Sequence, residues 1–373
     1  MIFSSSKEAA MKLFSGSKQN VFCIDGGNSM IKYLDCDNKV GIIKTACIDV
    51  SKVKDYSNSS TYDYYVSIYR VGKSQKFLGK FLFGLAASAS EDLYEERSLG
   101  KEKYSDKYLI YQMLTIIADK KGTAEPIEVR AMLPFAQIEY KDLYKKLFLG
   151  EYKVIFHNKK DKEVKVDIET VNIAIEGKRS FESQMKRILS EGDHDLNKFA
   201  GKYARKIIMM LDIGGGTIDI PWSTIEKSDK YYKTETRIFS TKFGMNFISG
   251  LIIEDLGRKN KVATIDEIVN AIINYDCKVI SDGKELSFKE ELKQRAIAGF
   301  EAALKRYLIH LKANQVDREI GIIFISGGGA CVLKDAFEQG IYKNTISGVD
   351  LDVEIRIVGD PIYHNVLSLK GSV

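Results

Sequence analysis

The sequence predicts an α/β protein made of two similar halves, and three observations support this. Residues 21–28 (Val-Phe-Cys-Ile-Asp-Gly-Gly-Asn) and 209–217 (Met-Met-Leu-Asp-Ile-Gly-Gly-Gly-Thr) each run from apolar residues into an aspartate and then into glycines. The two segments stand half a chain apart. Strand and helix patterns also alternate along both halves, which is typical of an α/β fold. The sequence therefore indicates a duplicated domain.

The two matching segments have the same local pattern. The apolar run before each aspartate is too short for a typical helix and is closed by glycine, so we expect buried strands. Glycine permits a tight turn that brings backbone N–H groups close to a phosphate. Strand patterns resume at 29–34 and 217–220, which predicts β-hairpins. Rossmann and P-loop proteins place a helix directly after the glycines, so both are excluded.

A third glycine cluster occurs in the second half. Residues 321–330 (Gly-Ile-Ile-Phe-Ile-Ser-Gly-Gly-Gly-Ala) form another apolar run that ends in glycines, and residues 331–337 follow with a short helix pattern. One glycine turn is weak evidence for a phosphate site. Two turns in matching places, with a third in the second half, indicate a protein that holds a nucleotide between two lobes.

These segments resemble the first phosphate, second phosphate and adenosine motifs of the superfamily of actins, sugar kinases and heat-shock chaperone ATPases. The motifs lie at 25–32, 211–220 and 325–330, in the family's order, and the resemblance extends from about residue 21 to 370. It implies two duplicated ribonuclease-H-like domains, a nucleotide cleft between the lobes and an inserted subdomain in each lobe. The first motif carries Gly26 and Asn28 where eukaryotic actins have Asn and Ser.

The resemblance divides the chain into an N-terminal extension, two lobes and a returning segment. These are expected at 1–20, at 21–190 with an inserted small subdomain at about 51–103, at 191–358 with an insertion at about 244–312, and at 359–373. The apolar spacing predicts helices over 104–118, 180–189, 247–256 and 290–311. It also predicts strands at 129–134 and 352–358 and a hairpin at 154–166.

Composition narrows the possible partners. The 373 residues carry a net charge of +5, which is far from the dense basic signature of a direct nucleic-acid binder. Lysines at 101–107 and 141–165 alternate with acidic residues, so we expect them on solvated faces. No segment approaches the roughly 18 consecutive apolar residues of a membrane span, and residues 1–20 lack the apolar core of a signal peptide.

The cysteines and histidines predict no metal centre. Five cysteines lack metal-ligand spacing, and Cys23, Cys47 and Cys331 lie in apolar runs, so we expect buried thiols in a reducing cytoplasm. The four histidines are far apart in the sequence. The expected metal is instead Mg²⁺ bound to phosphates, which Asp25 and Asp212 would face through retained waters, because Mg²⁺ dehydrates reluctantly.

The resemblance also implies which residues contact the nucleotide, ATP or possibly GTP. Backbone N–H groups of the first two glycine loops would hold the phosphates, the third loop would meet the adenosine, and residues before the 247–256 helix would close over the base. These candidates are Gly26, Gly27, Asn28, Ser29, Lys32, Gly214, Gly215, Gly216, Thr217, Lys242, Gly244, Gly327, Gly328, Gly329, Cys331 and Val332. Lys32 could instead be an exposed strand residue.

A carboxylate that orients the attacking water is expected where the lobes connect. Residues 171–177 form a strand that runs into Glu-Gly, similar to the Pro-Glu-Ser/Gly connection of plasmid-segregation actins, with Ile175 in place of the proline. Glu176 is therefore the candidate, with Asp25 and Asp212 as the other catalytic residues. Glu169 and Gln137 remain alternatives, and Glu176 could simply be a carboxylate at a helix start.

The connection around Glu176, the 326–330 loop and the Asp-Pro…Asn-Val pattern at 360–366 most resemble ParM-type plasmid-segregation actins. This resemblance implies a protein that polymerises on binding ATP, hydrolyses it in the filament and moves plasmid DNA through a ParR-type adaptor on a centromere-like site. The aromatic stretches 62–69 and 77–85 could be subunit contacts or part of the small subdomain. A metabolite kinase and a cell-shape or division actin remain alternatives.

Overall fold

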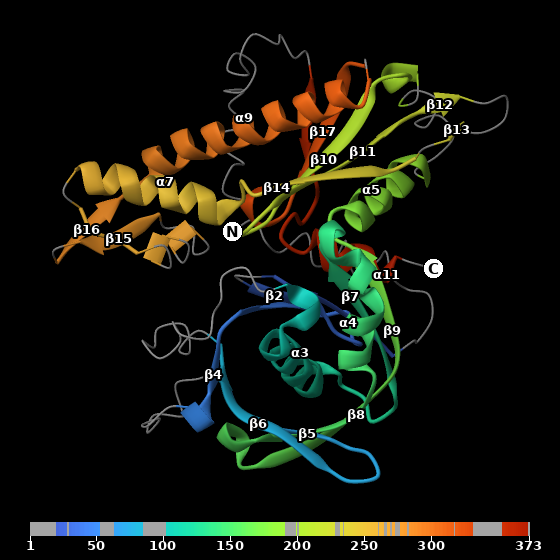
Figure 1. The fold of residues 1–373 in the computed structure, drawn as a ribbon, viewed down its shortest axis with the longest axis vertical. Coiled ribbons are helices and arrows are strands. Elements are labelled where there is room, and N and C mark those ends of the chain that lie inside the picture. Colours follow the sequence, from blue (N-terminus) through green and yellow to red (C-terminus); the bar gives the residue numbers. More distant parts are fainter. Residues whose placement is uncertain are drawn as a thin grey trace. The chain divides into compact units, whose positions relative to one another are not determined.

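The computed structural model describes residues 20–27, 30–52, 63–84, 102–190, 199, 201–227, 232–233, 235–259, 261–264, 267–268, 271–272, 277–281, 283–316, 318–330 and 353–371. The chain divides into two compact units, which are Met1–Glu176 with Asn365–Val373, and Gly177–His364 (Figure 1). None of the described helices combines the length and apolar character needed to cross a bilayer.

A nine-stranded sheet forms the first unit. Its strands are β1 (Val21–Gly26), β2 (Met30–Leu34), β3 (Val40–Lys44), β4 (Cys47–Asp49), β5 (Tyr64–Arg70), β6 (Lys76–Phe83), β7 (Ile127–Leu133), β8 (Gly150–Phe156) and β9 (Lys162–Ile175). Their order is β3-β2-β1-β7-β9-β8-β5-β6-β4. Strands β1, β7 and β9 run parallel, and the remaining neighbours pair antiparallel.

The central strands of this sheet are apolar because they are parallel and other elements pack against them. All six residues of β1 are buried, as expected for a parallel strand with both faces packed. Helix α3 (Lys107–Lys120) contributes a buried run from Gln112 to Ala118, and α4 (Lys141–Phe148) buries Tyr144 and Phe148. The side chain of Asp106 caps α3 by accepting hydrogen bonds from the backbone N–H groups of Tyr108 and Leu109.

The returning chain completes the first unit. Helix α11 (His364–Lys370) ends beside Arg130 of β7, whose Nη1 donates to the carbonyls of Leu369 and Lys370 at 3.0 and 3.2 Å. A cation at this end satisfies carbonyls that have no partner within the helix.

The first unit also contains short 3₁₀ turns. These are η1 (Val50–Lys52), η4 (Lys103–Ser105), η5 (Phe135–Tyr140) and η6 (His157–Lys159).

Within the small subdomain expected at about 51–103, the described residues form β5 and β6, which extend the main sheet. β5 pairs with β8, β6 pairs with β5, and β4 closes the edge. In Figure 1 they lie on the side of the sheet away from β2. Phe81 and Phe83 are buried under α3, whereas Phe77 is 54% exposed. Most of the aromatic residues here therefore belong to the core.

A five-stranded sheet forms the second unit. Its strands are β10 (Ile207–Ile213), β11 (Ile218–Thr224), β14 (Arg237–Thr241), β17 (Ile320–Ser326) and β18 (Glu354–Ile357), in the order β14-β11-β10-β17-β18. Two small pairs are β12 (Glu226–Lys227) with β13 (Tyr232–Lys233), and β15 (Lys278–Ser281) with β16 (Lys284–Ser287). The helices are α5 (Lys178–Ser190), α7 (Met245–Arg258) and α9 (Lys289–Ala313).

The duplication inferred from the two glycine motifs appears in the strand topology. In the first unit, β3-β2-β1 is an antiparallel hairpin series followed by parallel β7 and β9. In the second unit, β14-β11-β10 is the same series followed by parallel β17 and β18. Asp25 pairs in register with Lys32, and Asp212 with Asp219. The two units therefore repeat one plan.

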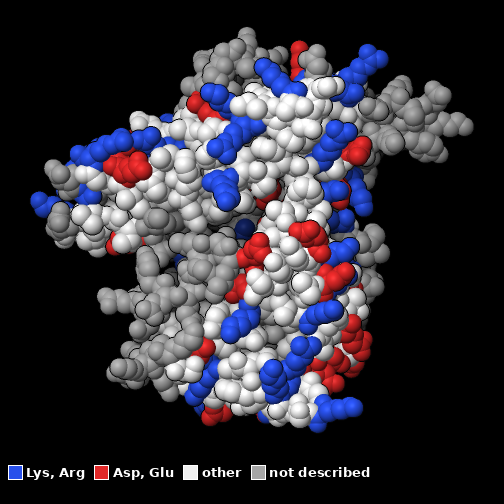
Figure 2. All heavy atoms as spheres, in the orientation of Figure 1, with Lys and Arg blue, Asp and Glu red and all other residues white. Residues whose placement is uncertain are grey.

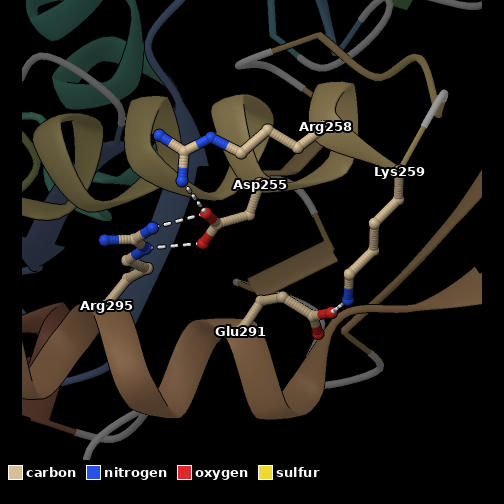
Figure 3. Close-up of polar contacts among 5 residues, drawn as sticks. All are labelled: Asp255, Arg258, Lys259, Glu291 and Arg295. Carbon is tan, nitrogen blue, oxygen red and sulfur yellow. Dashed lines mark hydrogen bonds and ion pairs between the residues drawn. The ribbon is translucent and has the colours of Figure 1, made fainter.

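Helices α7 and α9 of the second unit pack side by side through an apolar seam and a set of ion pairs (Figure 3). Arg295 of α9 binds Asp255 of α7 with two nitrogen atoms, and its Nε lies 2.5 Å from Oδ2. Arg258 also reaches Asp255, at 3.4 Å, while Lys259 pairs with Glu291. Bidentate arginine–carboxylate contacts fix orientation as well as distance.

Most predicted elements are confirmed. The structure has helices at the predicted 104–118, 180–189, 247–256 and 290–311, strands at 129–134 and 352–358, and the hairpin at 154–166, with shifted ends. Cys23 is buried, which raises its pKa to about 12, and Cys47 is half-buried. The predicted helix at 331–337, Cys331 and residues 1–19 lie outside the described residues.

Phe22→Ala is expected to lower the free energy of unfolding by about 3–5 kcal/mol, the usual cost of deleting a buried phenylalanine. Phe22 is fully buried on β1 and stacks on Tyr33, with ring centroids 5.9 Å apart. Phe77→Ala, at the exposed start of β6, is the matched control, with a loss below about 1 kcal/mol. Urea denaturation without nucleotide measures both variants, and equal losses would contradict the assigned core.

Candidate functional site

The first glycine turn is built around close backbone contacts. The N–H of Gly27 donates to the carbonyl of Met30 at 3.1 Å, and Thr45 Oγ1 donates to the Gly27 carbonyl at 2.7 Å. A Cβ on Gly27 would lie 2.6 Å from the Met30 oxygen, so a side chain does not fit there. Asn28 and Ser29, between these residues, lie outside the described part of the chain.

Two candidate catalytic carboxylates of the first unit lie together. Asp25 and Glu176 are buried, and both form ion pairs with the buried Lys103. Lys103 Nζ lies 3.6 Å from Asp25 Oδ1 and donates a hydrogen bond to Glu176 Oε1. Asn365 Nδ2 donates to Asp25 Oδ2 at 3.4 Å. The ends of β1 and β9, η4 and α11 thus meet at one buried charged cluster.

The charges in this cluster stabilise one another. Burial alone would lower the pKa of Lys103, but the carboxylates of Glu176 and Asp25 outweigh it and leave that pKa raised. Burial likewise opposes ionisation of Asp25, yet Lys103 and Lys32 hold the pKa of Asp25 below its ordinary value. The cluster therefore contains a lysine cation and an ionised Asp25 carboxylate at neutral pH.

The expectation that the 101–107 lysines are solvated is wrong for Lys103. Its side chain is 8% exposed, and its partner Glu176 stands far along the chain. The local pattern of alternating charges carries no sign of this, because the burial of Lys103 depends on a contact across the fold. Lys107 of the same run is exposed as predicted.

The structure also separates the three candidates for the water-orienting residue. Glu176 lies at the end of β9 in the cluster with Asp25. Glu169 is exposed in the middle of the same strand, and Gln137 is half-buried on η5. Lys32 is half-buried on β2, directly across the strand pair from Asp25. Lys32 is therefore neither fully exposed nor distant from the candidate phosphate site.

The second glycine loop lies at the start of α7. The N–H of Gly214 donates to the Thr217 carbonyl at 2.9 Å and closes the turn. The N–H groups of Met245 and Asn246 donate to the carbonyls of Gly214 and Gly215, at 2.9 and 2.7 Å. The loop thus satisfies N–H groups that the first turn of a helix leaves without partners.

Gly244 allows this contact between loop and helix. A Cβ on Gly244 would lie 2.6 Å from the backbone of both Gly216 and Thr217. Gly244 was expected near the base, and the described contact is with the second phosphate loop itself. Lys242, two residues earlier, is exposed.

Two buried aspartates flank the second loop. Asp212 and Asp219 pair in register on β10 and β11. Gly327 has φ of +86°, and a Cβ there would lie 2.7 Å from Asp212 Oδ1. Thr217 Oγ1 lies 3.4 Å from Asp219 Oδ2. Asp219 was not among the site residues predicted from the sequence, although it closes the Gly-Gly-Gly-Thr-Ile-Asp motif.

The third glycine loop packs on the same strand. A Cβ on Gly329 would lie 2.3 Å from Ile213 Cγ2. A Cβ on Gly328 would have no such neighbour within 4 Å. The second and third glycine loops are therefore neighbours within this unit. Cys331 and Val332 lie outside the described residues.

The described residues suit a phosphate-bound cation better than a metal held by protein alone. No group of three or more His, Cys, Asp and Glu side chains that could hold a metal ion occurs within the described ranges. Asp25 Oδ1 is buried and accepts no hydrogen bond from any described residue. A carboxylate oxygen with spare acceptor capacity can bind a water of hydrated Mg²⁺.

Gly244→Ala is expected to lower the free energy of unfolding by about 1–3 kcal/mol, the usual cost of overpacking. The added methyl group would overlap the backbone of Gly216 and Thr217. Gly250→Ala on the same helix has no atom within 4 Å of the new Cβ, and should gain up to about 1 kcal/mol from helix propensity. Thermal unfolding measures both, and a harmless Gly244→Ala would contradict the loop contact.

Known proteins were compared with this chain by sequence family and by structure. Residues 23–178 match the family model for the N-terminal domain of actin-like proteins. That stretch runs from β1 to the start of α5 and includes Asp25, Lys103 and Glu176. Curated protein sequences give no significant match.

Solved structures extend the similarity to nearly the whole chain. A non-polymerisable quadruple mutant of pCBH ParM has a TM-score of 0.67 at 17% identity, over 94% of this chain and 98% of that one. A 15-stranded ParM filament from Clostridium botulinum gives 0.67 at 16%, over 95% and 99%. An archaeal actin homologue in complex with ADP gives 0.64 at 15%, over 94% and 98%. These similarities confirm the actin-like fold that the motifs predicted, and residues 23–178 match the N-terminal domain of actin-like proteins.

Proposed function

We propose that this chain is an actin-like ATPase that polymerises on binding Mg-ATP and hydrolyses the nucleotide in the filament. The observation that carries the proposal is the repeated strand–aspartate–glycine hairpin, one in each unit, with a buried aspartate at the end of β1 and of β10. Similar proteins include a ParM filament and actin homologues in complex with ADP.

In this proposal, each unit supplies one phosphate loop to a single nucleotide. The lobes correspond to about 21–190 and 191–358, with residues 359–373 returning to the first. The compact units change at Glu176/Gly177 and at His364/Asn365, so they follow the same order along the chain with α5 in the second unit. Backbone N–H groups of Gly26–Ser29 and Gly214–Thr217 would bind the β- and γ-phosphates, and the loop at Gly327–Gly329 would meet the adenosine.

Asp25 and Asp212 are the proposed carboxylates facing Mg²⁺, through waters that the ion retains. Bound Mg²⁺ would neutralise charge on the phosphates during transfer. Asp25 suits this role because it is buried, ionised and has an oxygen atom without a hydrogen-bond partner among the described residues. Lys32, across the strand pair from Asp25, is the proposed side-chain contact to phosphate.

Glu176 is the proposed residue that orients the attacking water. It is buried in the cluster with Asp25, where a carboxylate can accept a proton or hold a water in line with the γ-phosphate. Transfer of this kind depends mainly on positioning and electrostatics. The exposed Glu169 lacks such surroundings.

Plasmid segregation in the cytoplasm through a ParR-type adaptor is the proposed biological role. It rests on the likeness to ParM structures. An adaptor is proposed because the charge does not favour direct DNA contact. Figure 2 shows Lys and Arg interspersed with Asp and Glu over the face that it draws, and the whole chain carries a net charge of only +5.

Right-angle light scattering after addition of Mg-ATP, over a series of protein concentrations, tests the function. Above a threshold concentration the signal should rise and then decay as ATP is consumed, because an open head-to-tail contact makes filaments and ATP favours the assembling state. EDTA should abolish the rise. A flat trace at every concentration, with nucleotide binding confirmed, would contradict assembly and favour a metabolite kinase.

Glu176→Gln is expected to reduce phosphate release at saturating ATP by about 10²–10⁴-fold, the usual contribution of a positioned acid or base. Assembly should persist, and the decay of light scattering should be delayed. Glu169→Gln, on the exposed part of the same strand, is the matched control and should behave like the wild type. Loss of assembly together with hydrolysis in Glu176→Gln would count against this role.

A further inference from the structure

Lys103 is a buried cation that none of the roles above uses. Its side chain is 8% exposed, and its two ion-pair partners are the buried Asp25 and Glu176. An unpaired buried charge is very costly, and even a paired one stabilises a fold weakly compared with apolar residues. A lysine in this position is therefore better explained by what it does to the carboxylates than by stability.

The backbone that carries Lys103 is firmly held. Tyr104, the next residue, stacks on Tyr140 of η5 with ring centroids 4.0 Å apart and an interplanar angle of 15°. The N–H of Asp106 donates to the Lys103 carbonyl at 3.3 Å, and the Asp106 side chain caps α3. The ammonium group is thus presented from a fixed turn.

The carboxylates need such a cation because they are close to one another. Lys103 Nζ contacts both Asp25 Oδ1 and Glu176 Oε1, so the two carboxyl groups share one small volume. Two buried like charges repel strongly at low dielectric. The Lys103 ammonium group donates a hydrogen bond to Glu176 Oε1 and forms an ion pair with Asp25 at 3.6 Å, so one cation interacts with both groups. Removal of Lys103 would take one hydrogen-bond donor from Glu176 and the neighbouring cation from Asp25.

We propose that Lys103 is a positioning residue that holds the Glu176 carboxylate beside Asp25 in the geometry needed for hydrolysis. This inference rests on the proposed function, because it gives Glu176 the role of orienting water. Lys103 acts through Glu176. Its loss should therefore reduce the rate at saturating ATP and leave nucleotide affinity nearly unchanged.

Lys103→Met, which keeps the length of the side chain and removes its charge, tests this. We expect the rate of phosphate release at saturating Mg-ATP to fall about 10–100-fold, as small misplacements of catalytic groups do, with KM within about threefold of wild type. Lys107→Met, an exposed lysine of the same run, is the matched control and should be unaffected. If Lys103→Met does not fold, Lys103→Gln is measured in its place.

A double-mutant cycle separates positioning from an independent role. Lys103→Met added to Glu176→Gln should slow hydrolysis no further, since the group that Lys103 positions is already absent. A further 10–100-fold loss in the double variant would show that Lys103 acts independently and would overturn the proposal. A wild-type rate in Lys103→Met would also overturn it.

Crystal structures of the wild type and of Lys103→Met without nucleotide test the positioning role independently of any measured hydrolysis rate. The proposal expects the Glu176 carboxylate to leave its wild-type position or to occupy several conformers. An unmoved Glu176 would overturn it. If the wild type does not hydrolyse Mg-ATP, the proposed function fails, and this comparison still shows whether Lys103 holds Glu176.

Discussion

Close packing of backbone against backbone at glycine turns is the constraint on which the candidate site depends. At Gly27, Gly244 and Gly327 a single Cβ would lie within 2.7 Å of another atom of the site. At these points the first turn packs against Met30, and the start of α7 packs against the second loop. The third loop packs against Asp212. Because the loops have no side chains at these points, their backbone N–H groups can approach a phosphate.

A second constraint is electrostatic and is confined to the first unit. Asp25 and Glu176 are buried together, and the Lys103 cation stabilises this arrangement by contacting both side chains. The end of β1, the end of β9, η4 and α11 all contribute a residue to the cluster. A movement of any of these elements would change the surroundings of Glu176, so the chemistry proposed for it is coupled to the packing of the whole unit.

The fold could be predicted from the sequence because its signals are local. The apolar runs before Asp25 and Asp212 and the glycines after them define the hairpins, and the helix at 290–311 has a clear apolar face. The placement of β4–β6 could not be predicted, because pairing of β5 with β8 joins segments distant in the chain. The burial of Lys103 could not be predicted for the same reason, because its partner Glu176 stands far along the chain. Asp219 stood within a recognised motif, and its burial follows from register with Asp212.

We propose that one nucleotide is held by a phosphate loop from each unit. A crystal structure of this chain with Mg²⁺ and a non-hydrolysable ATP analogue tests it most directly. We expect backbone N–H groups of both 26–29 and 214–217 to contact the phosphates, with the base at the 326–330 loop. Phosphates that contact only one of the two loops, or a nucleotide bound elsewhere, would contradict it.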